Sequence, residues 1–146
     1  MILYAESSAV LAWLVGQDAG RSVRDELSQA SLVLVSELTG VECRRAISRW
    51  VALGQVSEEG AAAWRFRLAR SAARWTVVAI AGQVLDRAVM PFPAEPVRTL
   101  DAIHIATALV VRVVQPDLAM LSLDARVRRN ADALGFAVLP AADEIG

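Results

Sequence analysis

Short apolar runs alternate with longer segments of mixed polarity along the whole chain, and this alternation limits the fold more than any other feature of the sequence. Parallel strands need long crossover connections, usually helices, and strands buried on both faces are short and continuously apolar. The apolar runs predict strands over Met1–Ala5, Leu32–Val35, Trp75–Ala79, Leu118–Ser122 and Phe136–Leu139. We therefore expect an α/β fold with a central parallel sheet covered by helices on both faces.

Seven segments between these runs are expected to be helices. They are Ser7–Gly16, Asp18–Gln29, Glu37–Leu53, Ser57 to about Arg74, Ala81–Val89, Thr99–Val114 and Asp124–Leu134. Gly54 and Gly135 end two of them, as glycine commonly does at helix C-termini, and Pro91 and Pro93 stop a third. At 146 residues, without an internal repeat or a linker, the chain is expected to be a single domain over residues 1–146.

Composition narrows the classes of protein to which the chain can belong. No apolar stretch reaches the length of a membrane span, and the N-terminus lacks the pattern of a signal peptide, so we expect a cytoplasmic protein without a membrane partner. The net charge of −1 excludes attraction to nucleic acid through overall charge. The mean hydropathy of +0.42 indicates a strongly buried sheet or an apolar surface that a partner covers. The single cysteine, Cys43, excludes a disulfide framework and is expected to pack as an apolar side chain.

Four acidic residues stand out by their position. Glu6 and Asp124 each follow a predicted strand, Glu42 lies within the helix Glu37–Leu53, and Asp101 lies in the first turn of the next long apolar helix. Ligands of open parallel sheets bind at the carboxyl ends of the strands. Clustered carboxylates need a compensating cation, and a set of carboxylates without cysteine favours Mg²⁺ or Mn²⁺ over zinc. One interpretation is a shared metal site suited to phosphodiester hydrolysis.

The acids also have structural interpretations, taken one at a time. Glu42 could pair with Arg45 or Arg49 along its helix. Asp101 could stabilise a helix N-terminus, and Asp124 could cap the following helix. Residue spacing alone leaves both the shared metal site and these separate roles open.

The motifs around the acids resemble the PIN domain, and within it the VapC toxins of bacterial toxin–antitoxin systems. That family opens with a strand, an acid, a pair of hydroxyl residues and alanine, which is matched by the stretch Tyr4-Ala5-Glu6-Ser7-Ser8-Ala9. The second acid of the family lies on a helix and is followed by Arg-Ala, which is matched here by Glu42 and, three residues later, Arg45-Ala46. Its "LDALHLATA"-like helix is matched almost letter for letter by Leu100 to Ala108, and its last acid by Ser122-Leu123-Asp124. The resemblance spans nearly the whole chain in the right order.

The resemblance implies a three-layer α/β/α sandwich and a metal-dependent endoribonuclease. It implies that Glu6, Glu42, Asp101 and Asp124 are the catalytic residues and hold Mg²⁺ or Mn²⁺. It also implies a homodimer and a cognate VapB-like antitoxin that blocks the site.

One position departs from the family, because its first acid is normally Asp. The Glu6 carboxylate reaches about 1.5 Å further, which would weaken a site for Mg²⁺. This departure keeps one alternative open, and a second stays open independently of it. One is a PIN-like protein with a degenerate site that only binds RNA or a protein partner, and the other is a metal-dependent phosphohydrolase acting on small phosphoesters.

Several residues near the acids have two interpretations each. Ser8 and Ser122 could donate hydrogen bonds to the acids, or cap the helices that follow them. Arg98 and Arg126 could bind RNA phosphates, or lie on solvated helix faces. His104 lies one turn after Asp101 and is assigned a structural role rather than a catalytic one. Trp50 and Trp64, on the third and fourth helices, are expected to be buried in the groove between those helices.

Overall fold

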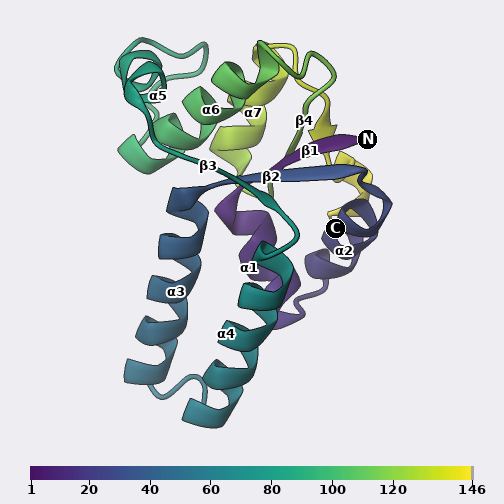
Figure 1. The fold of residues 1–146 in the computed structure, drawn as a ribbon, viewed down its shortest axis with the longest axis vertical. Coiled ribbons are helices and arrows are strands. Elements are labelled where there is room, and N and C mark those ends of the chain that lie inside the picture. Colours follow the sequence, from purple (N-terminus) through teal and green to yellow (C-terminus); the bar gives the residue numbers. More distant parts are fainter. Residues whose placement is uncertain (146) are drawn as a thin grey trace.

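The computed structural model describes residues 1–145, which form a five-stranded sheet flanked by helices (Figure 1). The strands are β1 (Ile2–Ala5), β2 (Leu32–Ser36), β3 (Thr76–Val78), β4 (Ala119–Leu121) and β5 (Val138–Leu139). All pairs are parallel, in the order β3-β2-β1-β4-β5. From β1, the strands β2 and β3 follow in chain order toward one edge of the sheet, and β4 and β5 follow toward the other edge. The boundary between β1 and β4 is therefore the switch point, where sheets of this kind bind ligands.

Within residues 1–145, seven α-helices and one short 3₁₀ helix accompany the strands. They are α1 (Ser7–Val15), α2 (Ala19–Gln29), α3 (Glu37–Ala52), α4 (Glu58–Ala72), α5 (Gly82–Ala88), α6 (Thr99–Arg112), α7 (Ala125–Ala133) and the 3₁₀ helix Ala142–Glu144. Every predicted strand and helix is confirmed, with bounds shifted by no more than two residues. No helix in this range combines the length and the apolar character needed to cross a membrane.

Hydroxyl side chains and a glycine set several helix ends. The Ser36 hydroxyl accepts the backbone N–H of Leu38 at the start of α3, and the Ser57 hydroxyl accepts that of Gly60 at the start of α4. Gly16 ends α1 with a left-handed φ of 76°. These local signals explain why the helices begin and end where the sequence indicates.

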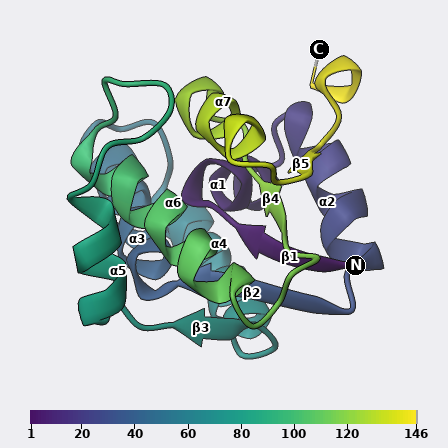
Figure 2. The same ribbon diagram turned by 90° about the horizontal axis from the view of Figure 1, so that it is seen from above.

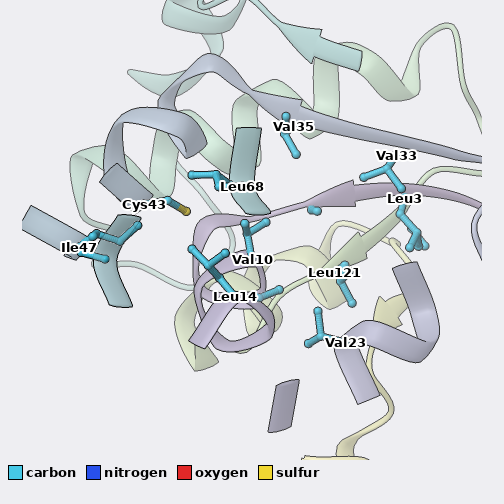
Figure 3. Packing of buried hydrophobic residues seen from close by; sticks show 14 residues of the cluster. Leu3, Val10, Leu14, Val23, Val33, Val35, Cys43, Ile47, Leu68 and Leu121 are labelled. Atoms are coloured by element: carbon cyan, nitrogen blue, oxygen red, sulfur yellow. The ribbon is translucent and has the colours of Figure 1, made fainter. Parts of the chain in front are cut away.

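The alternation of strand residues divides the core into two layers. Leu3, Val33 and Leu121 pack with side chains of α1, α2, α3 and α4 on one face of the sheet (Figure 3). Tyr4 and Met120 point to the opposite face and pack with side chains of α6 and α7. In Figure 2, which looks down on the sheet, α6 and α7 lie in front and α3 and α4 lie behind. The structure thus confirms the predicted three-layer α/β/α sandwich with a central parallel sheet.

Of two predictions about buried side chains, that for Cys43 is confirmed, whereas Trp50 and Trp64 lie between their helices but are only half-buried. The rings of Trp50 and Trp64 pack edge to face at 5.7 Å between α3 and α4, and both residues are half-buried. Cys43 is fully buried in the layer below the sheet. Burial, reinforced by Glu42 and Glu6, raises the pKa of the Cys43 thiol to about 12, so this cysteine stays protonated and unreactive.

Candidate active site

The four predicted acids lie around the carboxyl edge of the sheet, near the switch point between β1 and β4. Glu6 directly follows β1, and its backbone N–H donates to the carbonyl of Leu121, the last residue of β4, at 2.9 Å. Asp124 comes shortly after β4 and caps α7. Glu42 extends from the second turn of α3, which begins where β2 ends, and Asp101 from the first turn of α6. The fold therefore delivers one acid from each of four segments to one region.

Glu6 is buried, with 4% of its surface exposed, and hydroxyl groups compensate its charge. Its Oε2 accepts the backbone N–H of Ser8 at 3.1 Å, the hydroxyl of Ser122 at 2.8 Å and the hydroxyl of Ser8. The same two serine hydroxyls accept the backbone N–H of Asp124, each at 3.1 Å. The interpretation of Ser8 and Ser122 as donors to an acid is therefore confirmed, whereas the helices that follow are capped by Glu6 and Asp124 and not by these serines. Because a buried carboxylate needs donors or a cation, these contacts explain how the first strand can end on an acid.

Glu42 is held by a serine and a histidine rather than by an arginine. Its Oε1 accepts the hydroxyl of Ser7 at 2.7 Å and lies 2.6 Å from Nε2 of His104. Among residues 1–145, no ion pair joins Glu42 to Arg45 or Arg49, so the interpretation as a pair along the helix surface is wrong. Burial alone would raise the pKa of Glu42, but the hydrogen bonds from His104 and Ser7 outweigh burial and lower that pKa below its ordinary value. Glu42 is therefore a carboxylate at neutral pH.

Arg98 bridges the other two acids. Its Nε lies 3.1 Å from Oδ2 of Asp101, which is only 8% exposed, and its Nη2 lies 3.6 Å from Oδ2 of Asp124. The other oxygen of Asp124, Oδ1, accepts the backbone N–H groups of Arg126 and Val127 at 2.8 and 3.1 Å. The predicted capping role of Asp124 is thus confirmed, and it leaves Oδ2 available for a second contact.

Each of the four acids has one oxygen held by hydrogen bonds and one without a hydrogen bond from residues 1–145. The oxygens without one are Oε1 of Glu6, Oε2 of Glu42, Oδ1 of Asp101 and Oδ2 of Asp124. Within the described chain, the Thr39 hydroxyl is the only fully buried side-chain polar atom that lacks a hydrogen-bond partner, so none of these four oxygens is fully buried. A set of accessible carboxylate oxygens is the donor chemistry that Mg²⁺ and Mn²⁺ prefer.

The acids stand as two pairs rather than as one closed cage. Glu6 and Glu42 lie on either side of His104, whose Nε2 is 4.0 Å from Glu6 Oε1, and Asp101 and Asp124 face Arg98. In the part of the chain that the structure describes, no three His, Cys, Asp or Glu side chains form a group that could hold a metal ion. The donor atoms thus fit a divalent cation in type, while the positive charge between Asp101 and Asp124 comes from Arg98.

Two residues that contact the site are not predicted from the sequence, and the structure refines the roles predicted for His104 and the two arginines. Ser7 and Tyr4 belong to the first motif and lie within two residues of Glu6, but the sequence predicts no contact for either. His104, assigned a structural role, contacts Glu42 directly. Arg98 faces the carboxylates, whereas Arg126, an exposed residue, reaches Asp124 only through its backbone N–H.

Comparison with known proteins identifies the family. The family model described as PIN domain matches residues 3–133 of this chain. Ribonuclease VapC35 of Mycobacterium tuberculosis is 33% identical over 141 residues, which cover 94% of this chain and 96% of that protein.

Solved structures share the fold at low sequence identity. A toxin–antitoxin complex from Klebsiella pneumoniae aligns with a TM-score of 0.66 at 14% identity, covering 96% of this chain and 97% of that chain. FitAcB from Neisseria gonorrhoeae aligns with a TM-score of 0.65 at 19% identity over the same shares of the two chains. With its sequence matched from residue 3 to residue 133 and its sandwich shared with these structures, the chain belongs to the PIN domain family and is similar to the VapC ribonucleases within it.

Proposed function

We propose that this protein is a metal-dependent endoribonuclease, the toxin of a VapBC-type toxin–antitoxin module. The observation that supports the proposal is that Glu6, Glu42, Asp101 and Asp124 lie as two pairs around the switch point, each acid having one carboxylate oxygen that accepts a hydrogen bond and one that accepts none. Similarity over 94% of the chain to a protein named as a ribonuclease supports RNA as the substrate.

The four acids would hold Mg²⁺ or Mn²⁺, which when bound activates water and stabilises the attacking and leaving oxygens of a phosphodiester. Neighbouring residues of the chain hold these carboxylates in place through hydrogen bonds. Ser8 and Ser122 fix Glu6, and the N-terminus of α7 fixes Asp124. Ligands fixed in this way lose little freedom when they bind a cation.

Two arginines at the site are proposed to bind the RNA backbone. Arg98 and Arg126 are both exposed and flank Asp101 and Asp124. Contacts between arginine and phosphate position a strand without reading its sequence. We therefore assign these residues to affinity for RNA rather than to choice of target.

The protein partners follow from the same proposal. We expect a homodimer, a VapB-like antitoxin and a cytoplasmic location. Phe66, Val89 and Val113 are 65%, 84% and 81% exposed and offer apolar surface to such partners.

One observation favours a second candidate function. Because Arg98 already neutralises Asp101 and Asp124, the site is electrostatically satisfied in part without a cation. A PIN protein in this condition could bind RNA or a protein without cleaving anything, as the replacement of the usual Asp by Glu6 also suggests.

Cleavage of a mixed RNA pool separates these candidates. We expect the purified protein to cut RNA at internal positions in Mg²⁺ or Mn²⁺ and to stop in EDTA. Parallel assays use single-stranded DNA and bis(p-nitrophenyl) phosphate. RNA binding without cleavage in any metal would contradict the proposal in favour of the binding module, and turnover of the small ester alone would favour the phosphohydrolase.

The Arg98→Ala variant is expected to bind Mn²⁺ more tightly than the unchanged protein, because the guanidinium no longer competes for Asp101 and Asp124. The Arg98 side chain is 66% exposed, so the gain is modest and largest at low ionic strength. Isothermal titration calorimetry measures the affinity. Arg126→Ala is the matched control, since it removes an exposed arginine side chain and keeps the backbone N–H that caps Asp124. Weaker Mn²⁺ binding by Arg98→Ala would refute the competition.

A further inference from the structure

A buried line of contacts connects β1 to α3 through the histidine of α6. The Tyr4 hydroxyl lies 2.7 Å from Nδ1 of His104, and Nε2 of His104 lies 2.6 Å from Oε1 of Glu42. Tyr4 and His104 are both 0% exposed. Three segments far apart in the sequence thus meet at one carboxylate of the candidate site.

The partners determine which ring nitrogen of His104 carries the proton. The Glu42 carboxylate can only accept a hydrogen bond, so Nε2 of His104 donates to it. The Tyr4 hydroxyl can then donate to Nδ1, which lies 2.7 Å away. An imidazole that donates from Nε2 to Glu42 and accepts from Tyr4 at Nδ1 satisfies both contacts. The hydroxyl of Ser7 adds a second donor to the same Glu42 oxygen at 2.7 Å.

The geometry points to His104 as a positioning residue that, held by Tyr4, fixes the Glu42 carboxylate so that Oε1 is engaged and Oε2 is left without a hydrogen bond and would be available to a cation. This role rests on the proposed function. Donors to the engaged oxygen restrict rotation of a ligating carboxylate, and loss of such partners typically lowers metal affinity or activity by about 10- to 100-fold.

His104 acts through Glu42 and not on the substrate. Both of its ring nitrogens are engaged, and the side chain is 1% exposed, so neither nitrogen is presented to RNA. Nε2 also lies 4.0 Å from Oε1 of Glu6, which is too far for a hydrogen bond. The nitrogen therefore lies near both glutamates but donates only to Glu42. Its donation to Glu42 offsets part of the repulsion between the two carboxylates.

The positioning role is tested by titrating the unchanged protein and three variants with Mn²⁺ and ranking their affinities. Compared with the unchanged protein, His104→Leu is expected to bind Mn²⁺ about 10- to 100-fold more weakly. His104→Gln keeps an N–H donor for Glu42 and is expected to recover most of the affinity. Tyr4→Phe removes only the hydroxyl that holds His104 and is expected to fall between the two.

A histidine that only fills space would give the opposite order. Leucine is apolar and similar in volume, so His104→Leu would then be tolerated at least as well as His104→Gln. Affinities for His104→Leu equal to those of the unchanged protein would overturn the positioning role. If His104→Leu does not fold, an Mn²⁺ affinity of Tyr4→Phe equal to that of the unchanged protein overturns it instead.

Asp101→Asn separates failure of this inference from failure of the proposed function. If the unchanged protein binds Mn²⁺ and Asp101→Asn does not, the metal site is supported. The His104 variants then test only the positioning role. If the unchanged protein binds no Mn²⁺, the proposed function fails, and the positioning role fails with it.

Discussion

The Asp101→Asn variant is expected to cleave RNA about 10³-fold more slowly than the unchanged protein, or more slowly still, while staying folded. A bound divalent cation stabilises a hydrolytic transition state by several kcal/mol, and each 1.36 kcal/mol corresponds to about a tenfold change in rate. Asp101 is nearly buried, and the only charged group that contacts it among residues 1–145 is Arg98. Asparagine keeps an oxygen that can accept from Arg98 but loses the negative charge that a cation needs.

Initial rates of RNA cleavage in Mn²⁺ measure this effect, and circular dichroism checks the fold. Asp117→Asn makes the same chemical change at an exposed residue between α6 and β4, and it is expected to leave the rate unchanged. Cleavage by Asp101→Asn at the unchanged rate would show that Asp101 is not a ligand.

The Glu6→Gln variant is expected to lose RNA cleavage by about 10²-fold or more, on the same reasoning. Glutamine keeps a carbonyl oxygen that can accept from Ser8 and Ser122, so the link between β1 and β4 is preserved. Its amide nitrogen replaces the free oxygen of Glu6 and cannot bind a cation. Cleavage rates and thermal unfolding together distinguish loss of a ligand from loss of the fold.

Glu6→Asp tests the departure from the family most sharply. The shorter side chain withdraws the carboxylate by about 1.5 Å from the serine donors that hold it, so we expect this variant to cleave no faster than the unchanged protein. An inert unchanged protein together with an active Glu6→Asp variant would instead establish a degenerate site.

The strands and helices were predictable because their signals are local. Apolar runs, hydroxyl caps and glycines act over a few residues, and they set the ends of α1, α3 and α4 closely. The exceptions have local causes that a pattern does not reveal. β5 begins at Val138 rather than Phe136, because the N–H of Phe136 donates to the carbonyl of Ala131 and so completes the end of α7.

The positions of the four acids could be predicted from the sequence, but the side-chain contacts between them and their neighbours could not. The four carboxylates stand out because they interrupt apolar sequence or follow strands. The contact of Tyr4 with His104 joins residues 100 positions apart, and that of His104 with Glu42 joins residues 62 apart. Such contacts depend on how α3 and α6 pack around β1, and residue spacing does not encode this packing. The bridge made by Arg98 between two helix N-termini has the same origin.

Calorimetric titration of metal-free protein with Mn²⁺ tests most directly whether the four carboxylates form one cation site. Four variants are compared with the unchanged protein: Glu6→Gln, Glu42→Gln, Asp101→Asn and Asp124→Asn. Asparagine caps helices as well as aspartate does, so the last variant leaves the start of α7 intact. We expect the unchanged protein to bind Mn²⁺ and each variant to bind it about tenfold more weakly or worse. No binding by the unchanged protein, or undiminished binding by all four variants, would contradict a shared metal site.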